Sequence, residues 1–237
     1  VLRRAAPIAR DLVSLFDARH DPRRKADGEK AAHAASTAID RGLADVSAID
    51  DDRILRLYRG VINATLRTNM FAAAATEALA FKLDSAAVPG LPDPRPWREV
   101  FVYSPRVEGI HLRAGPVARG GLRWSDRRDD FRTEILGLMK AQQVKNAVIV
   151  PVGSKGGFVC KQLPPASERD AYQAEGIECY KTFIRGLLDL TDNLLGNEVA
   201  PPQNVVRLDD DHPSAVGRFA CGFSQRIPSP SEMAVGR

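Results

Sequence analysis

Apolar residues over the first seventy positions recur at helical spacing and predict three helices. The first is marked by Ile8, Leu12, Leu15 and Phe16, and it breaks near Asp21-Pro22. An alanine-rich stretch at about 25–43 gives the second, and a third is expected at about 51–69. The apolar stripe of the third comprises Ile54, Leu55, Tyr58, Val61, Ile62 and Leu66. Residues 1–70 are therefore expected to form a helical segment that packs onto the rest of the chain.

From about residue 99 onward the pattern changes to short apolar runs separated by turns and helices. A proline-rich stretch, 88–97, precedes predicted strands at 99–103 and 109–113, and a buried strand is expected at 147–150. A long helix should begin at a capping box, Ser167-x-x-Asp170, and cover the sheet. Its apolar face is expected to hold Tyr180, Phe183, Ile184, Leu187, Leu188 and Thr191. The predicted fold class is α/β, with the helical segment followed by a mixed sheet and flanking helices.

The helix expected after Asp129-Asp130 carries one lysine at a core position. Its apolar stripe comprises Phe131, Ile135, Leu138 and Met139. At about 100° per residue, Gln142 and Lys145 fall on the same stripe, whereas Lys140 points away from it. Burying an ammonium group without a partner costs several kcal/mol or lowers its pKa. Lys145 is therefore expected to meet an anion or to line a cleft, or else to extend its ammonium group into solvent from the last helical turn.

Three glycines surround a second lysine in the segment Gly153-Ser154-Lys155-Gly156-Gly157. We expect this segment to be a loop at the exit of the strand at 147–150, which is a common place for site residues in α/β sheets. A phosphate-binding P-loop is excluded because its lysine is followed by Ser or Thr, whereas Gly156 follows Lys155. Two interpretations remain, namely a loop that brings Lys155 close to a ligand and a plain glycine-rich turn with a solvated lysine.

A further glycine pair carries a cation at the other end of the same region, in Arg119-Gly120-Gly121. A single RGG is weak evidence for nucleic-acid binding, which calls for repeats or a wide basic face. The region thus supplies Arg119, Lys145 and Lys155 around one candidate cleft. Three cations that converge on one small volume suit a dicarboxylate ligand.

The stretch ARGGLRWSDRRDDFRTEILGLMKAQQVKNAVIVPVGSKGGFV resembles the substrate-domain signature of the glutamate dehydrogenase superfamily, and in detail the large NAD-specific enzymes of bacteria. Similarity extends upstream through DDRILRLYRGVINATLRTN and FVYSPRVEGIHLRAGPVARGG, and downstream through AYQAEGIECYKTFIRGLLDLTDNLL to about Asp210. The resemblance implies oxidative deamination of L-glutamate to 2-oxoglutarate and ammonia with NAD as the cofactor.

The resemblance also implies roles for individual residues. Lys155 matches the catalytic lysine of the family, whose lowered pKa lets it activate water at the 2-oxo carbon. Lys145 matches the lysine that binds the α-carboxylate, and Gln142 matches a position that assists it. Arg119 stands where smaller members carry a lysine at the side-chain carboxylate, next to Gly120 and Gly121. Arginine keeps the charge there but presents a planar fork of donors.

Two parts of the family pattern are not found in the sequence. No GxGxxG follows a predicted strand, so a Rossmann domain is expected to be absent and NAD to be bound outside this chain. The stretch with the catalytic aspartate is also unmatched, and Asp209–Asp211 are expected to form a solvated acidic turn. We expect a substrate-binding domain at 71–210 and an unmatched, irregular tail at 211–237. Because the chain begins at Val1, we expect it to be a fragment that is incomplete at its N-terminus. Without a nucleotide-binding fold we expect this fragment to be inactive alone.

Composition adds few constraints. The net charge of +4 is small, the apolar content of 44% is typical of a soluble globular protein, and no apolar run is long enough to span a bilayer. The cysteines, Cys160, Cys179 and Cys221, fit a reducing compartment, and we expect a cytoplasmic protein without a metal site. His111 is expected to be a surface histidine or a satisfied one. The full-length protein is expected to be a homo-oligomer.

Two other classes of protein remain open at this point. A dehydrogenase of another, apolar amino acid would share both lysines, although Arg119 favours a second carboxylate. A non-enzymatic RNA-binding or scaffold module would use an Arg-rich face around Arg123, Arg127 and Arg128. The recurring Arg53, Arg56 and Arg59 are expected to form a solvated helix face. We expect a small-molecule substrate, glutamate or 2-oxoglutarate, with neither nucleic acid nor membrane as a partner.

Overall fold

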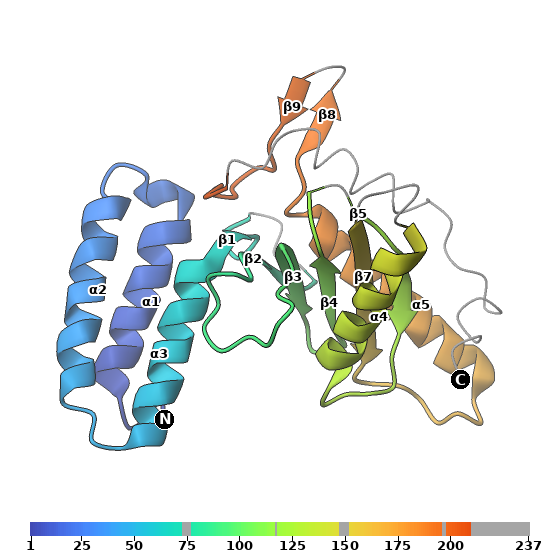
Figure 1. Cartoon of the computed structure of the whole chain (residues 1–237), viewed down its shortest axis with the longest axis horizontal. Coiled ribbons are helices and arrows are strands. Elements are labelled where there is room, and N and C mark those ends of the chain that lie inside the picture. The colour runs from blue at the N-terminus through green and yellow to red at the C-terminus, as the bar shows by residue number, and fades with distance from the viewer. Residues whose placement is uncertain (73–76, 117, 147–151, 196–197, 210–237) are drawn as a thin grey trace.

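A computed structural model describes residues 1–72, 77–116, 118–146, 152–195 and 198–209. The chain begins with three helices, α1 (Ala6–His20), α2 (Gly28–Ala44) and α3 (Ile49–Ala64), and a 3-10 turn, η1 (Pro22–Arg24), lies between the first two. They form a bundle at one end of the molecule (Figure 1). The bundle has its own apolar core, which includes Ile8, Leu12, Leu15, Ile39, Leu43 and Leu55. The predicted helical segment is confirmed.

The third helix ends earlier than the sequence predicts. It stops at Ala64, and β1 (Thr65–Thr68) follows without a loop and pairs with β2 (Leu79–Leu83). The prediction of helix to about residue 69 is therefore wrong. Leu66 happens to fall on the apolar stripe of the helix, but pairing with β2 makes residues 65–68 a strand. The helical segment ends at Ala64 rather than at residue 70. Whether residues 1–70, 71–210 and 211–237 are separate domains stays a prediction.

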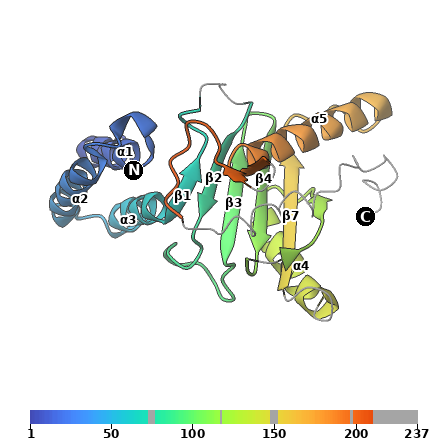
Figure 2. The ribbon, with the colours of Figure 1, turned by 90° about the horizontal axis from the view of Figure 1, so that it is seen from above.

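A seven-stranded sheet forms the body of the molecule (Figure 2). Its order is β1-β2-β3-β4-β7-β5, with β6 also paired to β7. The remaining strands are β3 (Arg98–Tyr103), β4 (Val107–Arg113), β5 (Ala118–Arg119), β6 (Leu122–Trp124) and β7 (Val152–Cys160). The pairs β1–β2, β2–β3, β3–β4 and β4–β7 are antiparallel, whereas β5 and β6 run parallel to β7. The sheet is mixed, as predicted, and the strands expected near 99–103 and 109–113 are confirmed.

Two helices cover opposite faces of the sheet (Figure 2). The first, α4 (Phe131–Asn146), packs on β4 and β7 through a cluster that includes Ile110, Leu112, Phe131, Ile135, Met139 and Val159. The second, α5 (Arg169–Leu188), packs on the other face through Phe158, Cys179, Phe183 and Leu187. A small hairpin, β8 (Asn193–Leu195) and β9 (Glu198–Ala200), follows α5. The predicted strand at 147–150 and the predicted tail at 211–237 lie outside the described residues.

The long helix α5 differs from its prediction at both ends. Its N-cap residue is Glu168, which makes no side-chain capping hydrogen bond, so the predicted capping box is wrong. Leu188 is 46% exposed, and Thr191 lies beyond the helix end. The buried face instead includes Gly186, where an added Cβ would lie 2.8 Å from Val102. Small residues let α5 approach the sheet closely, which a count of large apolar residues does not detect.

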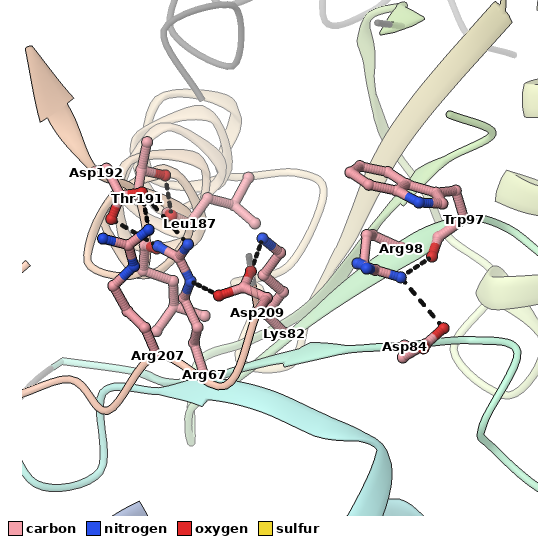
Figure 3. Close-up of polar contacts among 11 residues, drawn as sticks. Arg67, Lys82, Asp84, Trp97, Arg98, Leu187, Thr191, Asp192, Arg207 and Asp209 are labelled. Atoms are coloured by element: carbon pink, nitrogen blue, oxygen red, sulfur yellow. Dashed lines mark hydrogen bonds and ion pairs between the residues drawn. The ribbon is translucent and has the colours of Figure 1, made fainter. Parts of the chain in front are cut away.

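A buried cluster of charges ties the C-terminal segment to the sheet (Figure 3). Arg67 of β1 is fully buried and donates from Nη1 to Asp192 Oδ1 at 2.7 Å and from Nε to Asp209 Oδ1 at 2.7 Å. Lys82 of β2 donates to Asp209 Oδ2 at 2.5 Å. The side chain of Asp209 is only 1% exposed, so the predicted solvated acidic turn is wrong for this residue. Its partners, far away in sequence, stabilise it in the interior.

One buried histidine makes the helical bundle sensitive to acid. The side chain of His20, at the end of α1, lies against Phe16 with ring centroids 4.9 Å apart. Burial and, next, the charge of Arg19 lower the pKa of His20 from 6.5 to about 4. Between these two values the unfolded chain binds a proton that the folded chain does not bind. The contribution of His20 to the free energy of unfolding is therefore fully present above pH 6.5, and it is lost as the pH is lowered towards 4.

We expect His20→Leu to remove this loss. In wild type, His20 is expected to change the free energy of unfolding by about 3 kcal/mol between pH 6.5 and pH 4, since each pKa unit corresponds to about 1.36 kcal/mol. The measurement is urea unfolding at several pH values between 4 and 7. His33→Leu, at an exposed position of α2, is the control and should keep the acid-dependent loss. The same pH dependence in wild type and His20→Leu would contradict the account.

Candidate functional site

The turn that contains Gly120 and Gly121 lies directly against β7. Arg119 pairs with Gly153 across β5 and β7, and Leu122 pairs with Gly156 across β6 and β7. The backbone N–H of Gly156 donates to the carbonyl oxygen of Gly121 at 3.1 Å. A Cβ added at Gly120 would lie 1.5 Å from the carbonyl oxygen of Ser154, so only glycine fits at position 120. The fold thus brings the predicted residues 119–121 onto the strands next to Lys155.

Lys155 itself lies in a strand. The segment 153–157 belongs to β7, so the predicted glycine loop is wrong, and Lys155 pairs with Leu112 of β4. None of the glycines of β7 has a positive φ. They serve close packing instead, because a Cβ at Gly157 would lie 2.2 Å from Ile135 Cδ1, and one at Gly156 would lie 2.3 Å from Leu122 Cδ2. Glycine is needed here for the approach of neighbouring elements and not for a turn.

Alternation along β7 determines which face Lys155 occupies. Side chains two residues apart in a strand share a face, so Lys155 lies on the same face as Gly157. Gly157 lies beneath Ile135 of α4. Lys155 therefore projects from the face that α4 covers, whereas Phe158 and Cys160 belong to the core under α5.

The helix α4 has the orientation that its stripe predicts. Ile135 and Met139 are buried, Lys140 is exposed, and Gln142 is half-buried. Gln142 is seven residues beyond Ile135, a rise of about 10 Å, which corresponds to about three residues of strand. Because Ile135 lies over Gly157, we expect Gln142 near the level of Lys155, and Lys145 belongs to the last turn of α4. The side-chain positions of Lys145 and Arg119 lie outside what the structure describes.

One acidic residue near this site escaped the sequence prediction. Glu134, in the first turn of α4, accepts a hydrogen bond from Arg123 Nε of β6 and another from Ser125 Oγ, the latter at 2.5 Å. The side chain of Glu134 is 11% exposed. Acidic residues in a first helical turn are common because of the helix dipole, so the sequence offered no reason to single it out.

The Arg-rich face of the alternative hypothesis is largely occupied by contacts within the chain. Arg123 pairs with Glu134, and Arg127 pairs with Asp130, whose pKa is lowered by the hydrogen bond from Arg127. Arg128 donates to the carbonyl oxygen of Lys161 at 2.5 Å. These contacts hold the three guanidinium groups against groups of the same chain.

Other residues with reactive side chains lie on the opposite face of the sheet from Lys155, because His111 pairs with Gly156, and Cys160 and Cys179 belong to the core under α5. His111 is 5% exposed, so the surface alternative is wrong, and burial followed by the charge of Arg113 lowers its pKa to about 3. Cys160 and Cys179 are buried free thiols, and their mutual hydrogen bond, followed by burial, raises the pKa of Cys160. Such thiols are poor nucleophiles. The described residues contain no cluster of three or more histidine, cysteine or acidic ligands for a metal ion.

The described residues define the class of protein, an α/β domain whose mixed sheet is covered by α4 on one face and by α5 on the other. The sequence matches the family described as bacterial NAD-glutamate dehydrogenase, catalytic domain, over residues 38–222. The chain belongs to this family.

Similar proteins named NAD-specific glutamate dehydrogenase occur in several bacteria. The chain is 57% identical over 213 residues to the protein of Halomonas elongata, 56% over 216 residues to that of Pseudomonas aeruginosa, and 54% over 224 residues to that of Mycobacterium tuberculosis. These matches cover 88–89% of this chain. The chain spans only 13–14% of the length of these relatives.

The described strands do not provide a dinucleotide-binding fold. Their sheet is mainly antiparallel, and its parallel pairs are the short β5 and β6 with β7, whereas dinucleotide folds use a doubly wound parallel sheet. The described strands therefore show no doubly wound parallel sheet of the kind that holds a dinucleotide. In the same described residues, no helix is both long enough and apolar enough to cross a membrane.

Proposed function

We propose that this chain is the glutamate-binding and 2-oxoglutarate-binding portion of an NAD-dependent glutamate dehydrogenase. The observation that carries the proposal is the packing of the Gly120-Gly121 turn against β7, next to Lys155. This packing supports a site in which Arg119, Lys145 and Lys155 bind one dicarboxylate. Membership of the family supports the same conclusion.

In this proposal each cation has a separate task. Lys145 binds the α-carboxylate, assisted by Gln142, and Arg119 binds the side-chain carboxylate. Gly120 and Gly121 let the ligand approach the backbone of the turn. Lys155 lies at the 2-oxo carbon, where it activates the attacking water and stabilises the charge that develops on the carbonyl oxygen.

The remaining attributes of the complete protein are part of the same proposal. NAD supplies the hydride acceptor and is held outside the described residues of this chain. The complete protein is a cytoplasmic homo-oligomer that acts in glutamate catabolism. Binding of the dicarboxylate, not turnover, is the activity proposed for this chain by itself.

Lys145→Ala is expected to weaken the binding of 2-oxoglutarate to this chain at least about tenfold, since hydrogen bonds to charged groups contribute about 1.5–3 kcal/mol. The measurement is isothermal titration calorimetry with 2-oxoglutarate. Lys140→Ala removes an equal charge from the exposed side of the same helix and should leave the affinity unchanged. Equal affinity of wild type and Lys145→Ala would remove the proposed site, and salt-sensitive retention of RNA by the chain would favour a nucleic-acid module instead.

A further inference from the structure

A single carboxylate joins the glycine turn to the helix that carries Gln142. Both oxygens of Glu134 are used, one by Arg123 Nε and the other by Ser125 Oγ. Ser125 is 2% exposed, and its backbone N–H donates to the carbonyl oxygen of Phe158 at 2.8 Å. Its Oγ also accepts from the backbone N–H of Arg127 at 3.1 Å. Glu134 therefore contacts both ends of the segment that follows the turn.

The contacts of Glu134 with Arg123 and Ser125 help to hold the turn in place, because the strands on either side of the turn are short. β5 has two residues and β6 has three, and both pair with β7 alone. Such short parallel pairs contribute few hydrogen bonds. The charge-assisted contact between Glu134 and Arg123 adds a third connection, and such contacts are about twice as strong as neutral ones. The turn is thus held by β7 directly and by α4 through Arg123 and Ser125, which follow it in the chain.

We propose that Glu134 is a positioning residue that fixes the turn of residues 119–121 relative to Lys155, and so sets the preference for a ligand with two carboxylates. This inference rests on the proposed function, in which Arg119 binds the side-chain carboxylate. Lys145 and Lys155 lie on α4 and β7, which pack together through Ile135 and its neighbours and not through Glu134. Loss of the carboxylate therefore displaces the Arg119 end of the ligand site and leaves the other end in place.

The test compares two ligands and two variants. Glu134→Gln keeps the shape of the side chain and removes its charge. The variant is expected to lower the affinity for 2-oxoglutarate about tenfold. The affinity for 2-oxobutyrate, which lacks the second carboxylate, should stay within about twofold of wild type. Asp130→Asn removes an exposed partner of Arg127 close to the same helix start and should leave both affinities unchanged. If Glu134 had a merely structural role, its substitution would lower the affinities for both ligands equally, and that result would overturn the proposal.

A second measurement separates this inference from the proposed function. The amide of Gly156 donates to Gly121 O, so its hydrogen exchange reports whether the turn stays on β7. We expect faster exchange at Gly156 in Glu134→Gln and no change in Asp130→Asn. Unchanged exchange in Glu134→Gln would overturn the positioning role whatever the ligands do. If wild type bound neither 2-oxo acid, the proposed function would fail, and exchange at Gly156 would still decide the role of Glu134.

Discussion

Arg67→Met is expected to lower the free energy of unfolding by about 3–5 kcal/mol, because it leaves two buried carboxylates without their shared cation. Arg67 has no exposed surface, and the side chains of Asp192 and Asp209 are each 1% exposed. The measurement is urea unfolding at neutral pH, analysed for the midpoint and the slope. The control is Arg56→Met, which breaks the exposed pair of Arg56 with Asp52 on α3 and should cost less than about 1 kcal/mol.

The location of Arg67 explains why its substitution should lower the stability so strongly. Its guanidinium group contacts the segment that follows α5 through Leu190 O and Asp192, and the segment after the β8–β9 hairpin through Asp209 (Figure 3). The backbone N–H of Leu208 also donates to Leu66 O on β1 at 3.1 Å. Equal losses in Arg67→Met and Arg56→Met would show that the cluster does not hold the C-terminal segment.

Gly120→Ala is expected to destabilise the chain by about 3 kcal/mol and to abolish measurable binding of 2-oxoglutarate. The added methyl group would lie 1.5 Å from Ser154 O, a backbone atom that cannot move without separating the turn from β7. The measurements are unfolding in urea and calorimetric titration with the ligand.

Gly121→Ala provides a matched control for this substitution. No atom lies within 4 Å of the Cβ that it would add, although the two glycines are adjacent. We expect near wild-type stability for Gly121→Ala, because the added methyl group meets no atom of the chain. If Gly120→Ala behaved in the same way, the close approach of the turn to β7 would not be a feature of the protein in solution.

The helix of the site was the part that sequence periodicity predicted best. The stripe of α4 is buried as expected at Phe131, Ile135 and Met139, and Lys140 is exposed. This worked because a helix that covers a sheet has a regular period and a single buried face. The same reasoning placed Gln142 and Lys145 towards the sheet, and their contacts with a ligand stay predictions.

The strand that carries Lys155 could not be predicted in the same way. Glycine and serine have low strand propensity, so the segment 153–157 suggested a loop. Its state is determined by β4 on one side and β6 on the other, and both are partners that lie outside any local window. Asp209 was misjudged for the same reason, because its partner Arg67 is 142 residues away in sequence.

The central claim is that the last turn of α4 and the strand β7 present two ammonium groups to one dicarboxylate. The most direct test is a crystal structure of the chain with bound 2-oxoglutarate. The account predicts the α-carboxylate within hydrogen-bond distance of Lys145 Nζ, the 2-oxo group beside Lys155 Nζ, and the second carboxylate at Arg119. A ligand bound elsewhere, or the two Nζ atoms on opposite faces of the sheet, would contradict it.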